Sequence, residues 1–222
     1  NTTNLGQFAV GYGTQATGHV AFSAGRGTTA SGNFSTAMGY DTTASGLVST
    51  AMGYDTTASG YSSTALGSRT NASGDYSTAS GWNSTASGDM STTMGRLTTA
   101  SDYASLVIGQ YNSSGFSATD ANNYSPSNTA FVIGNGINDS NRSDAFKVMF
   151  NGDATVSNDL TVSGDVNVSS DARLKANIAS LGSTIAKLLL IDGKSYTMKK
   201  DGKQKIGVLA QDVQKVFPEL VT

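Results

Sequence analysis

The chain has 222 residues, of which 37% are hydrophobic and 8% aromatic, so a large private hydrophobic core is excluded. It contains no cysteine, which excludes disulfides and thiolate metal sites, and no apolar run is long enough to span a bilayer. The net charge of −2 is unevenly divided: residues 1–169 hold five Lys or Arg and eleven Asp or Glu, whereas residues 170–222 hold nine and five. We therefore expect a boundary near residue 169, and no cofactor, metal, nucleic acid or membrane insertion in this segment.

Glycine recurs every fourteen residues over the first half of the chain. The first series is Gly11, Gly25, Gly39, Gly53, Gly67, Gly81, Gly95 and Gly109. A second series, seven residues later, is Gly18, Gly32, Gly46, Gly60, Gly74 and Gly88, and Asp102 ends it. A repeat of this length predicts stacked structural coils. The sevenfold positions hold Gly, Ser, Thr and Ala instead of large aliphatic residues, so a coiled coil is excluded.

Each half of the repeat reads Gly-x-x-Ser/Thr-x-Ala-x-Gly. In an extended chain the Ser/Thr, Ala and Gly of this pattern point to one side, and the residues between them point to the other. Only small side chains line the first side. The pattern therefore predicts a mainly β fold, a narrow parallel β-solenoid whose interior is filled by Ala, Ser and Thr.

The outward side of the first half is apolar. Six of the eight residues directly before the first glycine are large and hydrophobic: Val10, Met38, Met52, Leu66, Met94 and Ile108. The equivalent positions of the second half hold Thr and Ser. An exposed apolar stripe would promote aggregation unless another chain covered it, and a closed homotrimer is a symmetric solution. We therefore interpret the six residues as a trimer interface.

Aromatic residues share the position directly after the first glycine. They are Tyr12, Tyr40, Tyr54 and Trp82. These rings could form an exposed ladder that stacks on sugar rings of a ligand, or they could stack on one another at the corners of the coils. Mutual stacking is the favoured interpretation.

The repeats resemble those of a known family. The segment YSSTALGSRTNASG, residues 61–74, is similar to the head repeats of trimeric autotransporter adhesins, and the resemblance covers residues 9–112. It implies a homotrimeric left-handed parallel β-roll, an exposed head over residues 1–112. It also implies binding to a receptor or glycan on a host or prey cell, and a location outside the cell, on a cell surface or in a virion fibre.

Two connecting pieces follow the repeats. Residues 113–150 are predicted to form a cap or connector, with strands over 131–134 and 145–150 and a turn between them. Residues 151–169 place Val156, Val162 and Val168 six residues apart. This rhythm predicts a stem, either a β-prism or a triple β-helix, which would also be stable only as a trimer.

The basic C-terminal part resembles a second family. SDARLK at 170–175, IDGKSYTMK at 191–199 and IGVLAQDVQKVFPEL at 206–220 are similar to the start of the endosialidase-type C-terminal intramolecular chaperone of phage tail spikes and fibres. The family domain normally continues further, so residues 170–222 are expected to be a partial domain, a small α+β segment with helices near 183–190 and 210–217.

The second resemblance implies self-cleavage. In that family the domain assembles the trimer and then severs the chain before the motif serine, which here is the Ser169–Ser170 bond. Ser170 would be the nucleophile and Lys175 its general base, provided that burial or a neighbouring cation lowers the pKa of the lysine. Without the family resemblance, the favoured interpretation is that Ser170 or Asp171 caps a turn.

Three classes of function remain from the sequence. The leading hypothesis is a trimeric fibre or adhesin head that recognises a cell surface and is assembled by a self-cleaving chaperone, with no activity on other molecules. One alternative is an ice-binding solenoid that uses outward Thr-Ala-Ser ranks such as 43–45 and 57–59. The other is a glycan-degrading tail spike, which would need clustered acids in a groove between subunits.

Overall fold

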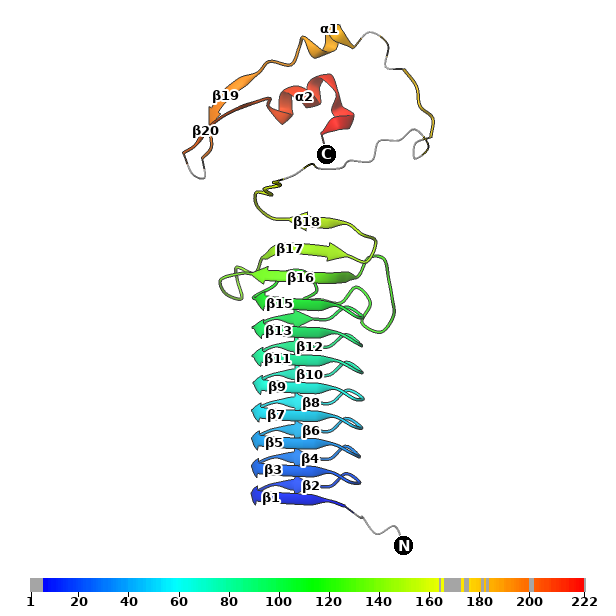
Figure 1. Cartoon of the computed structure of the whole chain (residues 1–222), viewed down its shortest axis with the longest axis vertical. Helices are drawn as coiled ribbons and strands as arrows, with labels where there is room; N and C mark the ends of the chain where they lie inside the picture. The colour runs from blue at the N-terminus through cyan, green and yellow to red at the C-terminus, as the bar shows by residue number, and fades with distance from the viewer. Residues whose placement is uncertain are drawn as a thin grey trace. The chain divides into compact units, whose positions relative to one another are not determined.

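The computed structural model of the chain describes residues 6–163, 165, 173, 176–180, 182, 184–199 and 202–221 (Figure 1). The chain divides into two compact units, Asn1–Thr161 and Val162–Thr222. The first, here called the solenoid unit, is a stack of β coils with a cap. The second, the C-terminal unit, is small and contains both helices and strands. The four-part division expected from the sequence stays a prediction.

Each coil of the solenoid unit has one long and one short strand. The long strands are β1 (Phe8–Tyr12), β3 (Phe22–Arg26), β5 (Thr36–Tyr40), β7 (Thr50–Tyr54), β9 (Thr64–Ser68), β11 (Thr78–Trp82), β13 (Thr92–Arg96) and β15 (Leu106–Gln110). The short strands are β2 (Gln15–Ala16), β4 (Thr29–Ala30), β6 (Thr43–Ala44), β8 (Thr57–Ala58), β10 (Asn71–Ala72), β12 (Thr85–Ala86) and β14 (Thr99–Ala100). Long and short strands form two separate sheets, which confirms the predicted β-solenoid.

The register of both sheets is one coil, or fourteen residues. In the long-strand sheet Met38 pairs with Met52 and Gly39 with Gly53, in parallel. In the short-strand sheet Thr43 pairs with Thr57. Equivalent residues of successive coils therefore lie in columns along the stack, separated by the usual strand spacing of about 4.8 Å.

Small residues fill the interior, as the alternation predicted. The buried alanines recur every seven residues, from Ala30 to Ala86, and are fully excluded from solvent. Between them lie buried Ser and Thr hydroxyls, such as Thr56 and Ser63. Thr93 stands where the neighbouring coil has Ala79, and its hydroxyl donates a 2.6 Å hydrogen bond to the Thr98 hydroxyl. The hydroxyl that Thr93 adds at an alanine position therefore has a hydrogen-bond partner inside its own coil.

The two glycine series are required by close backbone contact between coils. A Cβ on Gly60 would lie 2.0 Å from the carbonyl oxygen of Gly74, although the φ angle of Gly60 is one that any residue adopts. A Cβ on Gly53 would lie 1.8 Å from the Gly67 oxygen, and its φ of +135° is also unfavourable for an L residue. Each glycine leaves the space that the next coil occupies.

Each coil turns through left-handed residues that are not glycine. Val48 has a φ of 61° and Asp41 a φ of 50°. This conformation costs an L residue about 1–2 kcal/mol. Hydrogen bonds between coils oppose that cost, because Val48 N donates to Asn33 O at 2.8 Å and Asp41 N donates to Arg26 O at 2.8 Å.

Three further strands cap the stack. β16 (Thr129–Asn135) pairs in parallel with β15, and β17 (Asp144–Met149) and β18 (Ala154–Val156) follow antiparallel in the same sheet. The two strands expected in the connector are therefore confirmed. β18 adds a pairing that the expected stem did not include. Within the predicted stem, residues 157–163 form no strand, and residues 164 and 166–169 lie outside the described ranges. The stem therefore stays a prediction.

Asp102, which ends the second glycine series, fastens the cap to the last coil. Its side chain is 1% exposed, and its carboxylate accepts hydrogen bonds from Thr119 N at 2.6 Å and Thr129 N at 2.8 Å. We expect Asp102→Ala to destabilise the cap by about 3 kcal/mol, since it leaves these N–H groups without their acceptor. Urea unfolding measures this loss. Asp102→Asn, which keeps one acceptor oxygen, should lose less, and an unchanged midpoint for Asp102→Ala would contradict the anchoring role.

The C-terminal unit has the expected helix, hairpin and helix. α1 (Ile185–Leu188) is followed by the antiparallel hairpin of β19 (Lys194–Thr197) and β20 (Gln204–Gly207), then by α2 (Ala210–Val216) and the 3-10 helix η2 (Pro218–Leu220). Among the described residues, no helix has the length and hydrophobicity needed to cross a membrane.

Candidate binding surfaces of the solenoid

The predicted apolar stripe lies on the outer side of the long strands. We call Val10, Met38, Met52, Leu66, Met94 and Ile108 the long-strand stripe. Strand pairing places these residues in one column, which Ala24 and Ser80 complete. Val10, Met52, Leu66 and Met94 are exposed, with Val10 at 51%, and the other two are half-buried. This chain alone leaves the stripe open to solvent.

The stripe is broader at both ends of the stack than the sequence indicated. Phe8 and Phe22 lie two residues before the stripe positions of their strands, and their rings stack at 5.3 Å. At the capped end the equivalent positions hold Leu106 and Phe131. The period-2 alternation of a strand could have found them, because residues i and i+2 share a face.

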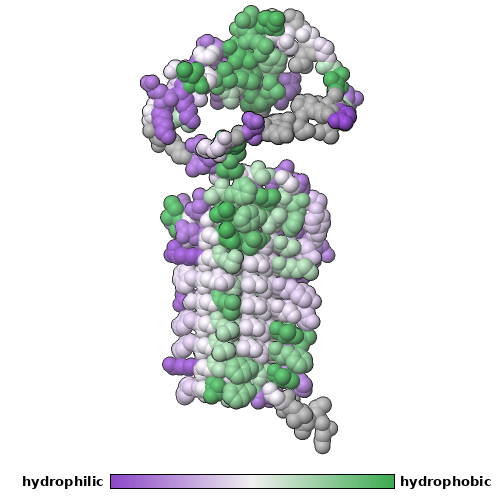
Figure 2. Space-filling view, in the orientation of Figure 1, coloured by the Kyte–Doolittle hydropathy of each residue, from purple (hydrophilic) through white to green (hydrophobic). Residues whose placement is uncertain are grey.

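A second apolar column lies at a corner that precedes the long strands. Val20, Phe34, Val48, Tyr76 and Met90 all have left-handed φ angles and are 45–54% exposed. We call these five residues the corner column. Figure 2 shows hydrophobic surface both along one face of the stack and at one of its edges. Sequence reasoning missed this column because left-handed turns favour Gly and Asn, although the fourteen-residue recurrence of apolar side chains was visible.

The aromatic residues after the first glycine contact one another and arginine. Tyr40 and Tyr54 stack with ring centroids 5.1 Å apart, which confirms mutual stacking for this pair. The Arg26 guanidinium lies over Tyr12 and Tyr40, at 5.9 and 5.2 Å, and Arg96 lies 5.4 Å over Trp82. Arg26 and Arg96 also follow a glycine of the first series, and this shared position was the sequence signal for the contact that we did not use. A role of these rings in ligand binding stays a prediction.

The proposed catalytic residues Ser170 and Lys175, and the bond before Ser170, lie outside the described residues. Their geometry is therefore untested, and their roles stay predictions.

Two side chains elsewhere have shifted pKa values with local causes. Hydrogen bonds from the backbone N–H groups of Asn122 and Asn123 lower the pKa of Asp120. The carboxylate of Asp192, 2.5 Å from Lys194 Nζ, raises the pKa of that lysine. Because the pKa of folded Asp120 is depressed, its contribution to stability is present above its unfolded pKa and is lost as the pH falls through the folded value. The Asp120 interactions order the loop before β16.

The fold defines a class of protein: a parallel β-solenoid of fourteen-residue coils with an uncovered apolar face. Within it, residues 23–96 match the family model of the YadA head domain repeat, in overlapping placements over 23–42, 30–56, 44–70, 58–84 and 72–96. Residues 170–222 match the model described as the chaperone of endosialidase. Both resemblances expected from the sequence are therefore confirmed. No curated protein matches the chain.

Proposed function

We propose that the chain is part of a homotrimeric fibre whose head is a bundle of left-handed parallel β-rolls that recognises a cell surface. The head would comprise residues 1–112, followed by a cap to 150, a stem to 169 and a chaperone segment from 170. The location would be outside the cell, on a cell surface or in a virion fibre. The observation that carries the proposal is the exposed long-strand stripe, in a chain that matches both an adhesin head repeat and a chaperone segment.

Burial of the stripe provides a driving force for association. Fully burying a Met, Leu or Val side chain contributes about 1.5–3 kcal/mol relative to full exposure. Met52, Leu66 and Met94 are 36–47% exposed, so each retains a part of this contribution for an interface. Because the strands pair in register, the stripe residues recur at one spacing along the stack. The strands of a neighbouring protomer have the same spacing, so each stripe residue can add its burial energy to the interface.

The corner column favours a ring of three over a dimer. A two-fold dimer needs one self-complementary patch, whereas a closed three-fold ring joins two different patches on each protomer. The long-strand stripe and the corner column are two such patches. Both follow the fourteen-residue period, although Ser62 interrupts the corner column and Ala24 and Ser80 interrupt the stripe. The corner column of one protomer can therefore pack along the stripe of the next, coil against coil.

The molecular mass in solution tests the assembly. The chain has a mass of 22.7 kDa, and light scattering should report three times that value. A monomer would contradict the proposed interface. The mass of residues 1–163 alone separates assembly by the solenoid unit from assembly by the C-terminal unit.

Self-cleavage is the second part of the proposal, supported by the match of residues 170–222 to the chaperone of endosialidase. The Ser170 hydroxyl would attack the carbonyl carbon of Ser169, with Lys175 accepting the hydroxyl proton. The Ser169–Ser170 amide bond would break as the Ser170 nitrogen takes up a proton, and water would then hydrolyse the resulting ester. In the complete gene product, Ser170→Ala should leave one uncleaved band on a denaturing gel. Ser180→Ala is the matched control and should cleave normally. A normal cleavage pattern for Ser170→Ala would refute the assignment.

One observation supports the alternative function, ice binding. The short-strand sheet aligns Thr29, Thr43 and Thr57 in one rank, as an ice-binding array would require. Asn71 and Gln15 interrupt the same rank. A thermal-hysteresis assay without ice shaping would exclude this alternative.

A further inference from the structure

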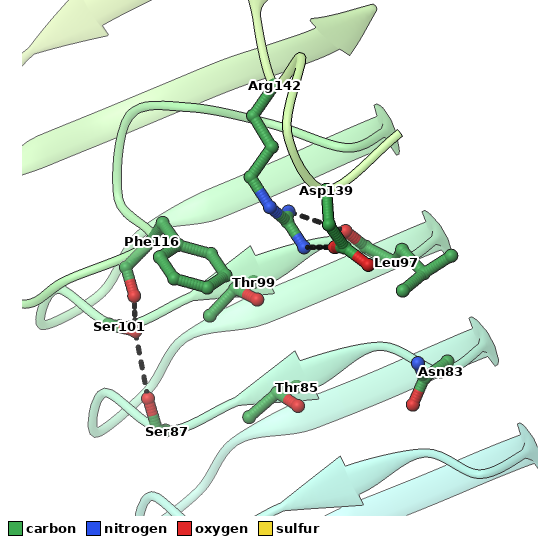
Figure 3. A pocket seen from close by; sticks show the side chains of 9 residues that line it. All are labelled: Asn83, Thr85, Ser87, Leu97, Thr99, Ser101, Phe116, Asp139 and Arg142. Atoms are coloured by element: carbon green, nitrogen blue, oxygen red, sulfur yellow. Dashed lines mark hydrogen bonds and ion pairs between the residues drawn. The ribbon is translucent and has the colours of Figure 1, made fainter. Parts of the chain in front are cut away.

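A hollow of about 490 Å³ lies beside the cap of the solenoid unit. Its floor is the outer side of the short strands β12 and β14, and its walls are the loop that carries Phe116 and the turn that carries Asp139 and Arg142 (Figure 3). Small-molecule sites commonly have volumes of about 300–1,000 Å³, so the hollow is large enough for one sugar residue.

The floor presents hydroxyl groups in a fixed pattern. Thr85 and Thr99 are directly paired on adjacent parallel strands, so their side chains point the same way at the strand spacing of about 4.8 Å. Ser87 Oγ donates to Ser101 Oγ at 3.1 Å, and Ser101 Oγ donates to the carbonyl oxygen of Phe116 at 3.0 Å. The same ladder therefore holds the aromatic wall in place.

The wall combines an aromatic ring with a guanidinium. The Phe116 side chain is 45% exposed, and the Arg142 guanidinium lies 4.3 Å from the centroid of its ring. Arg142 donates through Nη1 to Leu97 O at 3.0 Å and through Nη2 to Asp139 Oδ1 at 2.6 Å. The arginine side chain is only 16% exposed. These contacts fix its orientation before any ligand arrives.

The charges of the hollow balance. Asp139, 70% exposed, pairs with Arg142, so an anionic ligand would meet an arginine that is already neutralised. The hollow offers hydroxyls that both donate and accept hydrogen bonds, a carboxylate that accepts them, and an apolar ring. This combination suits a molecule with polar edges and an apolar face. A neutral sugar ring has this chemistry.

We propose that this hollow binds one residue of a neutral saccharide. The inference rests on the proposed function and deepens it, because it gives the recognised surface component a chemical class and a place on the chain. The hollow opens on the short-strand face, whereas the long-strand stripe belongs to the other sheet. A trimer built through the stripe would therefore leave three copies of the hollow free, and several weak sites would act together on a repetitive glycan.

The test uses an array of defined neutral and acidic oligosaccharides, probed with the fluorescently labelled full chain. The saccharide that binds best is then titrated against variants. Thr85→Val and Thr99→Val remove one hydroxyl each and keep the branched shape of the side chain, and each should weaken binding about tenfold. Thr43→Val and Thr57→Val, at the same repeat position in coils far from the cap, are the controls and should change it less than twofold.

Phe116→Ala should weaken binding by a similar factor, and thermal melting of each variant shows whether the fold persists. The proposal is overturned if the chain binds no neutral saccharide on the array, or if Thr57→Val weakens binding as much as Thr85→Val. In either case, a trimeric mass in solution would still support the proposed assembly. A monomeric chain that still binds saccharide through Thr85 would support the hollow and contradict the assembly.

Discussion

Replacing Gly60 with alanine should unfold the middle of the solenoid. The new Cβ would lie 2.0 Å from the carbonyl oxygen of Gly74, a backbone atom of the next coil. That atom cannot move away without breaking the hydrogen bonds that hold the coils together, among them the bond from Gly60 N to Ala72 O. We expect a loss of at least about 3 kcal/mol, the upper end for overpacking, because backbone atoms relax less than side chains do. Urea unfolding followed by circular dichroism measures it.

Gly152→Ala is the matched control. Gly152 belongs to the same unit and has a φ of +92°, but no atom lies within 4 Å of a Cβ built on it. This variant therefore tests left-handed strain without a clash, and should lose about 1–2 kcal/mol. If Gly60→Ala were as stable as Gly152→Ala, close coil packing would not be the reason for the glycine period.

Introducing aspartate into the long-strand stripe should convert the proposed trimer into monomers. Met52 is 38% exposed on the chain alone, so Met52→Asp puts the carboxylate into solvent in a monomer. In the trimer each interface would have to bury that charge without a partner, which costs several kcal/mol per site. Combining Met52→Asp with Leu66→Asp doubles the effect on adjacent coils. Light scattering should then report one third of the mass of the unmodified chain.

The control for this prediction adds the same charge to the opposite sheet. Ser59 is exposed beside the short strand β8, and Ser59→Asp should keep the trimeric mass. Met52→Leu, which keeps an apolar side chain, should keep it as well. A trimer that persists in the Met52→Asp, Leu66→Asp double variant would show that the stripe is not the interface.

The sequence predicted the coil well because one physical constraint repeats in every turn. Gly53 and Gly60 sit where the backbone of the next coil leaves no space for a Cβ. Ala58 and Thr56 face the interior because alternate residues of a strand share a side. Both constraints are local, so they can be seen in fourteen residues.

The corners could not be predicted by the same rules. Val48 adopts a left-handed conformation that sequence rules assign to glycine or asparagine, and its backbone is held by a hydrogen bond to Asn33 of the preceding coil. The strain is offset by an interaction that exists only once the coils are stacked. The corner column therefore became visible only in the structure.

The saccharide hollow also depends on distant parts of the chain. Thr85 belongs to the repeats, Phe116 to the loop after them, and Arg142 to the turn between β16 and β17. Composition showed that the loop was polar, but nothing local placed Arg142 against Phe116. The long-strand stripe could be located from the sequence because its residues recur with a fixed period. A site assembled from three distant segments has no periodic pattern in the sequence.

The one-coil register has a consequence for how such a fibre can evolve. Each coil contacts its two neighbours through the same backbone pairing, and the cap joins the stack at one end, through the pairing of β16 with β15 and through Asp102. A duplication or deletion of fourteen residues below the cap would therefore preserve every type of contact and change the reach of the head by about 4.8 Å. Recombination between near-identical repeats could therefore lengthen or shorten the solenoid in equal steps, and with it the distance at which the proposed head would meet a cell surface.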